Sequence, residues 1–153
     1  MRSTREVLED HLALAKQDDW ETDLKRNFSD DCVLLTSFGV FYGVEGLNQK
    51  IALLHEHLPN ATYVYESVLD HGEIGFLKWS GDSDTSYVDD GVDSYFIQNG
   101  KIRVMTIHYT PKRKGDVSQD CKKSPVYGRP VRVVKGNMTR GKTRSRQGKK
   151  KAA

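Results

Sequence analysis

Asp93-Ser-Tyr-Phe-Ile-Gln-Asn-Gly-Lys-Ile-Arg103 is the stretch that decides the fold of this chain. Two runs rich in aromatic and β-branched side chains, typical of strands, meet at Asn99-Gly100. An Asn-Gly pair between two such runs is a strong signal for a hairpin, because both residues tolerate a positive φ angle. The stretch therefore predicts two antiparallel strands, at 86–98 and 101–110, joined by a two-residue turn.

The residues before this hairpin continue the same pattern. The segments 62–70 and 74–80 are also rich in Tyr, Val, Ile, Phe and Trp, and Gly-containing pairs separate the four runs. This pattern predicts a meander of long antiparallel strands. Further toward the N-terminus, 32–36 is a short β-type run, and a tight turn after it leads into a second short run that ends near Tyr42-Gly43.

The period changes to that of helices in the first part of the chain. Ser3 and Glu6 form a capping-box pattern that predicts a helix from about 4 to 17. Asp18-Asp19 are expected to cap a short second helix, in which Trp20, Leu24 and Phe28 recur every four residues. A third helix is marked by Leu47, Ile51, Leu54 and Leu58 and stops before Pro59.

Two or three helices followed by a long antiparallel meander predict an α+β domain. Because sheets twist, such a sheet is expected to curve around the helices and enclose a cone with an open mouth. An apolar mouth lined by aromatic side chains is where a small molecule binds. We expect residues 1–111 to form this domain.

Charge divides the chain at the same place. Residues 112–153 contain 15 Lys and Arg against two Asp, so residues 1–111 carry 9 basic and 19 acidic side chains. The composition of 112–153 predicts a flexible basic tail. Three interpretations of it stay open: it contacts nucleic-acid phosphates without sequence preference, it folds back on its own acidic domain, or it reflects translation past a frameshift.

Several classes of protein are not expected. Cys32 and Cys121 have no second thiol or histidine near them at metal-ligand spacing, and the Asp residues at 82–90 lack the spacing of a calcium loop. No metal site and no cofactor are predicted. The N-terminus has no apolar signal segment and no run is long enough to cross a membrane, so we expect a cytoplasmic protein.

Four segments resemble the SnoaL-like group of the nuclear transport factor 2-like superfamily. They are Asp18-Asp-Trp20, Phe28-Ser-Asp-Asp-Cys-Val-Leu-Leu35, Tyr42-Gly-Val-Glu-Gly-Leu47 and the hairpin sequence 93–103, and the resemblance spans 6–110. It implies the cone-shaped fold derived above. The superfamily contains ketosteroid isomerases, polyketide cyclases, epoxide hydrolases and proteins with no catalytic activity, so the fold alone does not assign an activity.

The resemblance also suggests site residues. The position of the catalytic base in ketosteroid isomerases aligns with Thr36, which is not a base near neutral pH without a partner. Their oxyanion-donating tyrosine aligns with His11, and their protonated aspartate aligns with Asp93. This chain resembles the SnoaL-like cyclases more closely, and their acid/base work is attributed to a histidine and an aspartate that face one cavity. The resemblance therefore implies Asp93 and His11 as a catalytic acid/base pair, with Thr36 at the ligand.

Alternation along the last two long strands adds candidate ligand contacts. Tyr95 has the same parity as Asp93, and the resemblance places both on the concave side of the sheet, with Met105, Ile107 and Tyr109 facing the same cavity. Core packing explains these residues equally well. Alternation does not tell which side is inside for Trp79, Tyr63 and Tyr65, which stay unassigned.

These observations leave two main functions open. One is an isomerase, cyclase or hydrolase that acts without metal or organic cofactor on a small, apolar, oxygenated ligand, through Asp93 and His11. The other is a non-catalytic scaffold that binds a ligand or forms a homodimer through its sheet face, with the basic tail contacting nucleic acid.

Overall fold

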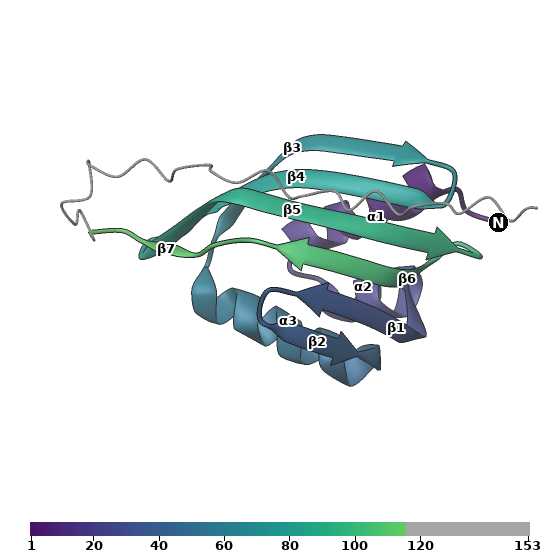
Figure 1. Ribbon diagram of the computed structural model, residues 1–153, viewed down its shortest axis with the longest axis horizontal. Helices are drawn as coiled ribbons and strands as arrows, with labels where there is room; N and C mark the ends of the chain where they lie inside the picture. The colour runs from purple at the N-terminus through teal and green to yellow at the C-terminus, as the bar shows by residue number, and fades with distance from the viewer. Residues whose placement is uncertain (116–153) are drawn as a thin grey trace, which may run out of the picture. The chain divides into compact units, whose positions relative to one another are not determined.

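The hairpin around Asn99-Gly100 forms as predicted. In the computed structural model, which describes residues 1–115, Asn99 and Gly100 have φ angles of 55° and 72°, and Gln98 pairs with Lys101. These angles are those that a two-residue hairpin turn requires. The turn joins strands β5 (Ser86–Gln98) and β6 (Lys101–His108), which lie in the middle of the sheet (Figure 1).

The other predicted strands extend the sheet on both sides of this hairpin. The strand order is β2-β1-β6-β5-β4-β3, and a short strand β7 pairs with β5 off this path. The predicted runs are confirmed to within a few residues at their ends. The strands are β1 (Phe28–Thr36), β2 (Gly39–Tyr42), β3 (Thr62–His71), β4 (Ile74–Asp82) and β7 (Lys112–Arg113).

The sheet is mixed, which corrects the expectation of a wholly antiparallel one. β1 pairs with β6 in the parallel direction, with Leu34 opposite Met105, whereas every other described pair is antiparallel. Tight turns set the direction of the hairpin strands. A third helix and the whole β3–β5 meander separate β1 from β6, so no local signal determines how the two strands run relative to each other.

All three helices pack on the concave side of the sheet (Figure 1). They are α1 (Thr4–Lys16), α2 (Trp20–Asn27) and α3 (Gly43–His57). The capping box of Ser3 and Glu6 is present, and the Asp19 side chain accepts a hydrogen bond from the backbone of Thr22. α3 begins four residues before the predicted Leu47, because the apolar pattern reveals only the part of a helix that faces the core.

Bulges and glycines allow the sheet to bend around the helices. The β3–β4 register shifts between Tyr65 and Ser67, and the β4–β5 register shifts between Trp79 and Gly81. Bulges increase the local twist of a strand. Gly91 lies opposite Trp79, and a Cβ at this glycine would come within 2.4 Å of the indole ring. The absence of a side chain at Gly91 therefore lets the Trp79 ring lie flat on β5.

The core fills the space between the helices and the concave face. It combines the apolar stripes of all three helices with the inward-facing residues of β1, β4, β5 and β6. The most deeply buried members are Val7, Leu8, Cys32, Leu34, Leu47, Leu58, Leu77, Val88, Tyr95 and Ile102.

The chain continues past the expected domain boundary at residue 111 with β7, which pairs with the start of β5. Lys112 forms an ion pair with Asp89, and Lys114 Nζ lies 2.9 Å from Asp82. The first basic residues of the expected tail therefore contact the acidic end of the β4–β5 hairpin. The rest of the tail, residues 116–153, lies outside the described residues.

Candidate functional site

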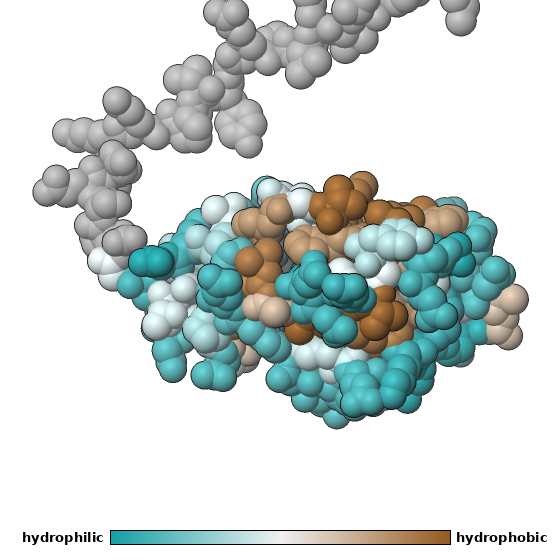
Figure 2. Space-filling model, turned by 90° about the horizontal axis from the view of Figure 1, so that it is seen from below, coloured by the Kyte–Doolittle hydropathy of each residue, from teal (hydrophilic) through white to brown (hydrophobic). Residues whose placement is uncertain are grey.

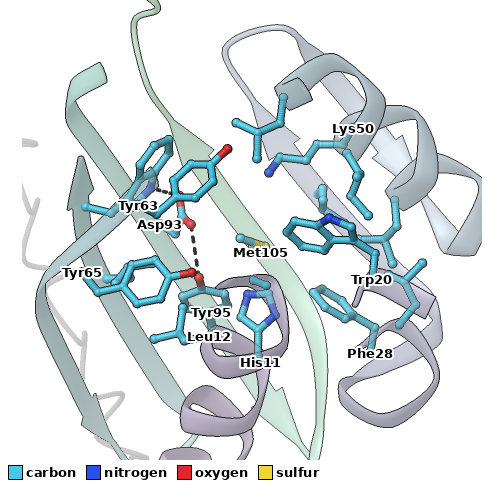
Figure 3. Close-up of a pocket in the computed structure, with 18 residues that line it drawn as sticks. His11, Leu12, Trp20, Phe28, Lys50, Tyr63, Tyr65, Asp93, Tyr95 and Met105 are labelled. Atoms are coloured by element: carbon cyan, nitrogen blue, oxygen red, sulfur yellow. Dashed lines mark hydrogen bonds between the residues drawn. The ribbon is translucent and has the colours of Figure 1, made fainter. Parts of the chain in front are cut away.

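A cavity of about 60 Å³ lies between the three helices and the concave face of the sheet (Figure 3). Its wall is mostly aromatic and aliphatic, and a few polar side chains reach into it. Because one water needs roughly 10–15 Å³ of such space, the cavity holds a few waters or one small organic group. Its lining includes His11, Leu12, Trp20, Phe28, Leu34, Leu47, Lys50, Ile51, Tyr63, Tyr65, Leu77, Trp79, Asp93, Tyr95 and Met105.

Asp93 is held on the sheet side of this cavity and is only 6% exposed. Its Oδ1 accepts a hydrogen bond of 3.0 Å from Trp79 Nε1, and its Oδ2 accepts one of 3.2 Å from the Tyr95 hydroxyl (Figure 3). Burial raises the pKa of Asp93, and the nearby Lys50 and the two hydrogen bonds oppose this change. The pocket thus favours the protonated acid more than water does.

His11 is 5% exposed and is bonded to Asp23 rather than to Asp93. Its Nδ1 lies 2.8 Å from Asp23 Oδ2, whose other oxygen accepts a 2.8 Å hydrogen bond from Asn27. Asn27 in turn accepts from Arg2 at 2.8 Å. Since the Asp23 carboxylate is an acceptor, Nδ1 donates to it. In the neutral ring, Nε2 then carries the lone pair, and the ring lines the cavity.

The arrangement therefore differs from a bonded His11–Asp93 pair. Asp93 comes from β5 and His11 from α1, and no hydrogen bond joins them among the described residues. They line the same cavity, and the charge of His11 is one of the influences on the pKa of Asp93. Each titratable group has its own partners.

Lys50 is a further polar residue of the cavity. It projects from α3 and is 9% exposed, and in Figure 3 its amine ends on the side of Asp93 and Tyr63. Within residues 1–115 no hydrogen bond or ion pair holds this amine. Burial lowers the pKa of Lys50, and Asp93 acts in the opposite direction.

The three aromatic residues that alternation left unassigned face inward. Trp79 is 4% exposed, and Tyr63 and Tyr65 are half-buried in the cavity wall. Burial raises the pKa of Tyr63 to about 12, and burial also raises the pKa of Tyr65. Both hydroxyls therefore keep their protons near neutral pH and are hydrogen-bond donors in the cavity wall, and the charge of Asp93 also acts on Tyr65.

Three of the expected ligand contacts do not line the cavity. Thr36 is in the β1–β2 hairpin, where its hydroxyl donates to the Gly39 carbonyl at 3.0 Å. Ile107 belongs to the core, and the Tyr109 hydroxyl lies 2.9 Å from His57 Nδ1. These three positions were carried over from the strands of relatives. A local bulge or a different length of the β1–β2 turn changes the face on which such a residue lies. Tyr95 and Met105 do line the cavity.

Lys50 and Asp23 were missed as polar residues of the site, although the sequence contains a signal for each. Lys50 stands three residues after Leu47 and next to Ile51, and Asp23 stands three residues after Trp20. Both spacings put a charged side chain on the apolar face of a helix. A charge at such a position is rarely buried without a specific partner or role.

The described part of the chain has no group of three His, Cys, Asp or Glu side chains placed to hold a metal ion. None of its helices combines the length and the apolar character that crossing a membrane requires.

Comparison with known proteins gives matches in structure only. No protein-family profile matches the sequence, and no curated protein matches it. A solved NTF-2 like protein of unknown function from Burkholderia xenovorans has a TM-score of 0.59 at 18% identity, covering 70% of this chain and 82% of its own. A SnoaL-like protein from Mesorhizobium loti, provisionally described as a polyketide cyclase, has a TM-score of 0.52 at 20% identity and covers 71% and 100%.

A third solved structure, TerC crystallised with polyporic acid, has a TM-score of 0.56 at 14% identity, covering 70% of this chain and 91% of its own. The fold of these solved structures agrees with the resemblance that rests on the segments 18–20, 28–35, 42–47 and 93–103. At these identities they establish the fold. The chain has the nuclear transport factor 2-like fold.

Proposed function

We propose that this protein binds a small oxygenated ligand with an apolar body and performs acid/base chemistry on it, as an isomerase or cyclase. One observation carries the proposal. An aspartate and a histidine from separate elements, each held by its own buried partners, line one apolar cavity. Such convergence of a few polar groups in an apolar pocket is typical of small-molecule sites.

The two groups suit opposite roles. Nε2 of His11 is positioned as a general base, because Asp23 holds the ring by its other nitrogen. Asp93 is suited to be a general acid, because burial favours its protonated form. Removal of a proton beside a carbonyl by His11, with donation from Asp93 to the carbonyl oxygen, gives an enol. Where a C=C bond adjoins this carbon, the product is a dienol. His11 then returns its proton to the far carbon of the diene while the hydroxyl returns its proton to Asp93, which restores the C=O and completes an isomerisation.

The ligand is expected to be small, or to enter by displacing side chains at the mouth. The cavity of about 60 Å³ is far below the roughly 300–1,000 Å³ of a site for drug-sized molecules. Trp20 and Tyr63 are half-buried members of the wall and are the side chains best able to move. TerC, which has the same fold, was crystallised with polyporic acid.

Proton exchange tests this proposal directly. In D₂O the protein is expected to accelerate deuterium incorporation at the carbons beside the carbonyl of butanone, followed by NMR. Asp93→Asn and His11→Gln are each expected to reduce the rate at least about 100-fold, the usual contribution of a general acid or base. Asp89→Asn, an exposed position on the same strand, is the matched control and should exchange like the wild type.

A second candidate function, dimerisation, rests on the convex face of the sheet. We define the outer sheet face as the side chains that alternate with the core residues, and many of them are apolar. Val40 is 70% exposed and Leu69 58%. Figure 2 views the molecule from the edge formed by β2 and α3, beside the outer sheet face, and shows that hydrophobic residues are exposed on this edge too. The exposed members are Leu35, Val40, Tyr42, Val64, Leu69 and Ile74.

Several exposed apolar side chains on one sheet face favour association of two copies through this face. Sedimentation of the wild type is expected to show a dimer, and Val40→Glu or Ile74→Glu should convert it into a folded monomer. Val44→Glu, at an exposed apolar position on α3, should leave the dimer intact. A wild type that sediments as a monomer would contradict dimerisation but would not contradict the proposed acid/base function. Contact of the basic segment 116–153 with nucleic acid stays a prediction from composition.

A further inference from the structure

Lys50 stands out among the polar groups of the cavity, because nothing among the described residues satisfies its amine. Asp93 is bonded to Trp79 and Tyr95, and His11 is bonded to Asp23. Lys50 is 9% exposed and points into the same space (Figure 3). A lysine this far buried gives up most of its contact with water without gaining a hydrogen bond from residues 1–115, so its place in the cavity needs an explanation.

The surroundings favour an uncharged amine. The stem of Lys50 lies among aliphatic residues of α3, and burial lowers its pKa. Burial raises the pKa of Asp93, its nearest opposite charge. Both changes favour a neutral amine beside a protonated acid over two buried ions. A neutral lysine amine is a nucleophile, whereas an ammonium is not.

The same reasoning selects the ligand. A carboxylate ligand would need a charged Lys50 and would bring another ion into the apolar cavity. An aldehyde or ketone is uncharged and carries one acceptor oxygen, which the hydroxyls of Tyr63 and Tyr65 can bind. The cavity is therefore better matched to a carbonyl compound than to an acid.

We propose that Lys50 forms a Schiff base with a small aldehyde or ketone in this cavity. The Nζ lone pair attacks the carbonyl carbon, and the C=O electron pair moves to oxygen, which takes the carboxyl proton of Asp93. The nitrogen of the resulting carbinolamine loses a proton to the Asp93 carboxylate. The carboxyl then returns this proton to the hydroxyl, which leaves as water while the nitrogen lone pair forms C=N. No oxidant or reductant takes part in the condensation.

Reductive trapping with propanal and sodium borohydride tests the proposal on the full chain. Near neutral pH we expect one propyl group to be added rapidly, and peptide mapping to place it on Lys50. Labelling of Lys50 should reach half its maximal rate at a lower pH than labelling of Lys25, because burial lowers the pKa of Lys50 whereas the hydrogen bond that Lys25 donates to Glu21 raises the pKa of Lys25. Preferential labelling of exposed lysines, with Lys50 unmodified, would overturn the proposal.

Two variants make the result specific. Lys50→Met keeps the length and apolar stem of the side chain and should lose the rapid adduct while retaining its circular dichroism and cooperative unfolding. Lys25→Arg should be labelled at Lys50 like the wild type. Rapid adduct formation by Lys50→Met would assign the reaction to another amine and exclude Lys50.

The Schiff base and the acid/base function use the same cavity, but different experimental results would contradict each of them. Butanone exchange by Lys50→Met at the wild-type rate, together with no trapping of the wild type, would remove the Schiff base and leave the acid/base function. Trapping at Lys50 without exchange would remove the acid/base function and leave the Schiff base.

Discussion

Asp23→Ala is expected to lower the free energy of unfolding by about 3 kcal/mol, because two buried donors lose their acceptor at about 1–3 kcal/mol each. Asp23 is 0% exposed, and its two oxygens accept from His11 Nδ1 and Asn27 Nδ2 at 2.8 Å. Among the described residues His11 Nδ1 has no other acceptor, whereas Asn27 also lies close to the Asp10 carboxylate. Urea unfolding followed by tryptophan fluorescence measures the change.

Two further variants separate stability from orientation. Glu21→Ala removes an exposed ion pair with Lys25 from the same helix, and its stability should be close to that of the wild type. Asp23→Asn keeps the shape and one acceptor oxygen, so it should fold. Its amide can donate to Nδ1 and stabilise the wrong tautomer of His11, so proton exchange should fall strongly in kcat with little change in KM. Normal exchange by Asp23→Asn would show that the contact is only structural.

Lys50→Met is expected to stabilise the protein by about 1–3 kcal/mol near neutral pH, since it replaces a largely buried lysine, whose amine makes no hydrogen bond with residues 1–115, by an apolar side chain. Burial lowers the pKa of Lys50 in the folded state below the ordinary lysine value of 10.5. The unfolded chain therefore binds the Lys50 proton more readily, and wild-type stability should rise with pH from the lowered pKa up to 10.5. The advantage of Lys50→Met should shrink over the same range.

Urea unfolding at a series of pH values checks both the gain and its direction. Lys78→Met, on the convex side of the sheet where Lys78 pairs with Glu66, is the control and should show no comparable gain. The contribution of Asp93 to stability changes with pH in the opposite direction. Its pKa is raised in the folded state, so this contribution makes wild-type stability fall as pH rises above 3.8. An advantage of Lys50→Met that grows toward alkaline pH would contradict a lowered pKa for Lys50.

The sequence predicted part of the candidate site. Asp93 and Tyr95 were found because an Asp in the middle of a strand is unusual, and because residues two apart share a face. His11 was found on the apolar stripe of α1. Its partner was not, because Asp23 lies on a different helix and only the packing of α1 against α2 brings the two together.

The sequence by itself determined the elements and most of their neighbours. Residues close in the chain decide these: Ser3 with Glu6 begins α1, and Asn99-Gly100 turns β5 into β6. Only the tertiary structure decided that β1 runs parallel to β6, that Trp79 faces inward, and that Lys50 points into the cavity without a hydrogen bond to any residue of 1–115. These facts depend on contacts between segments far apart in the sequence, whose geometry arises when the curved sheet closes over the helices.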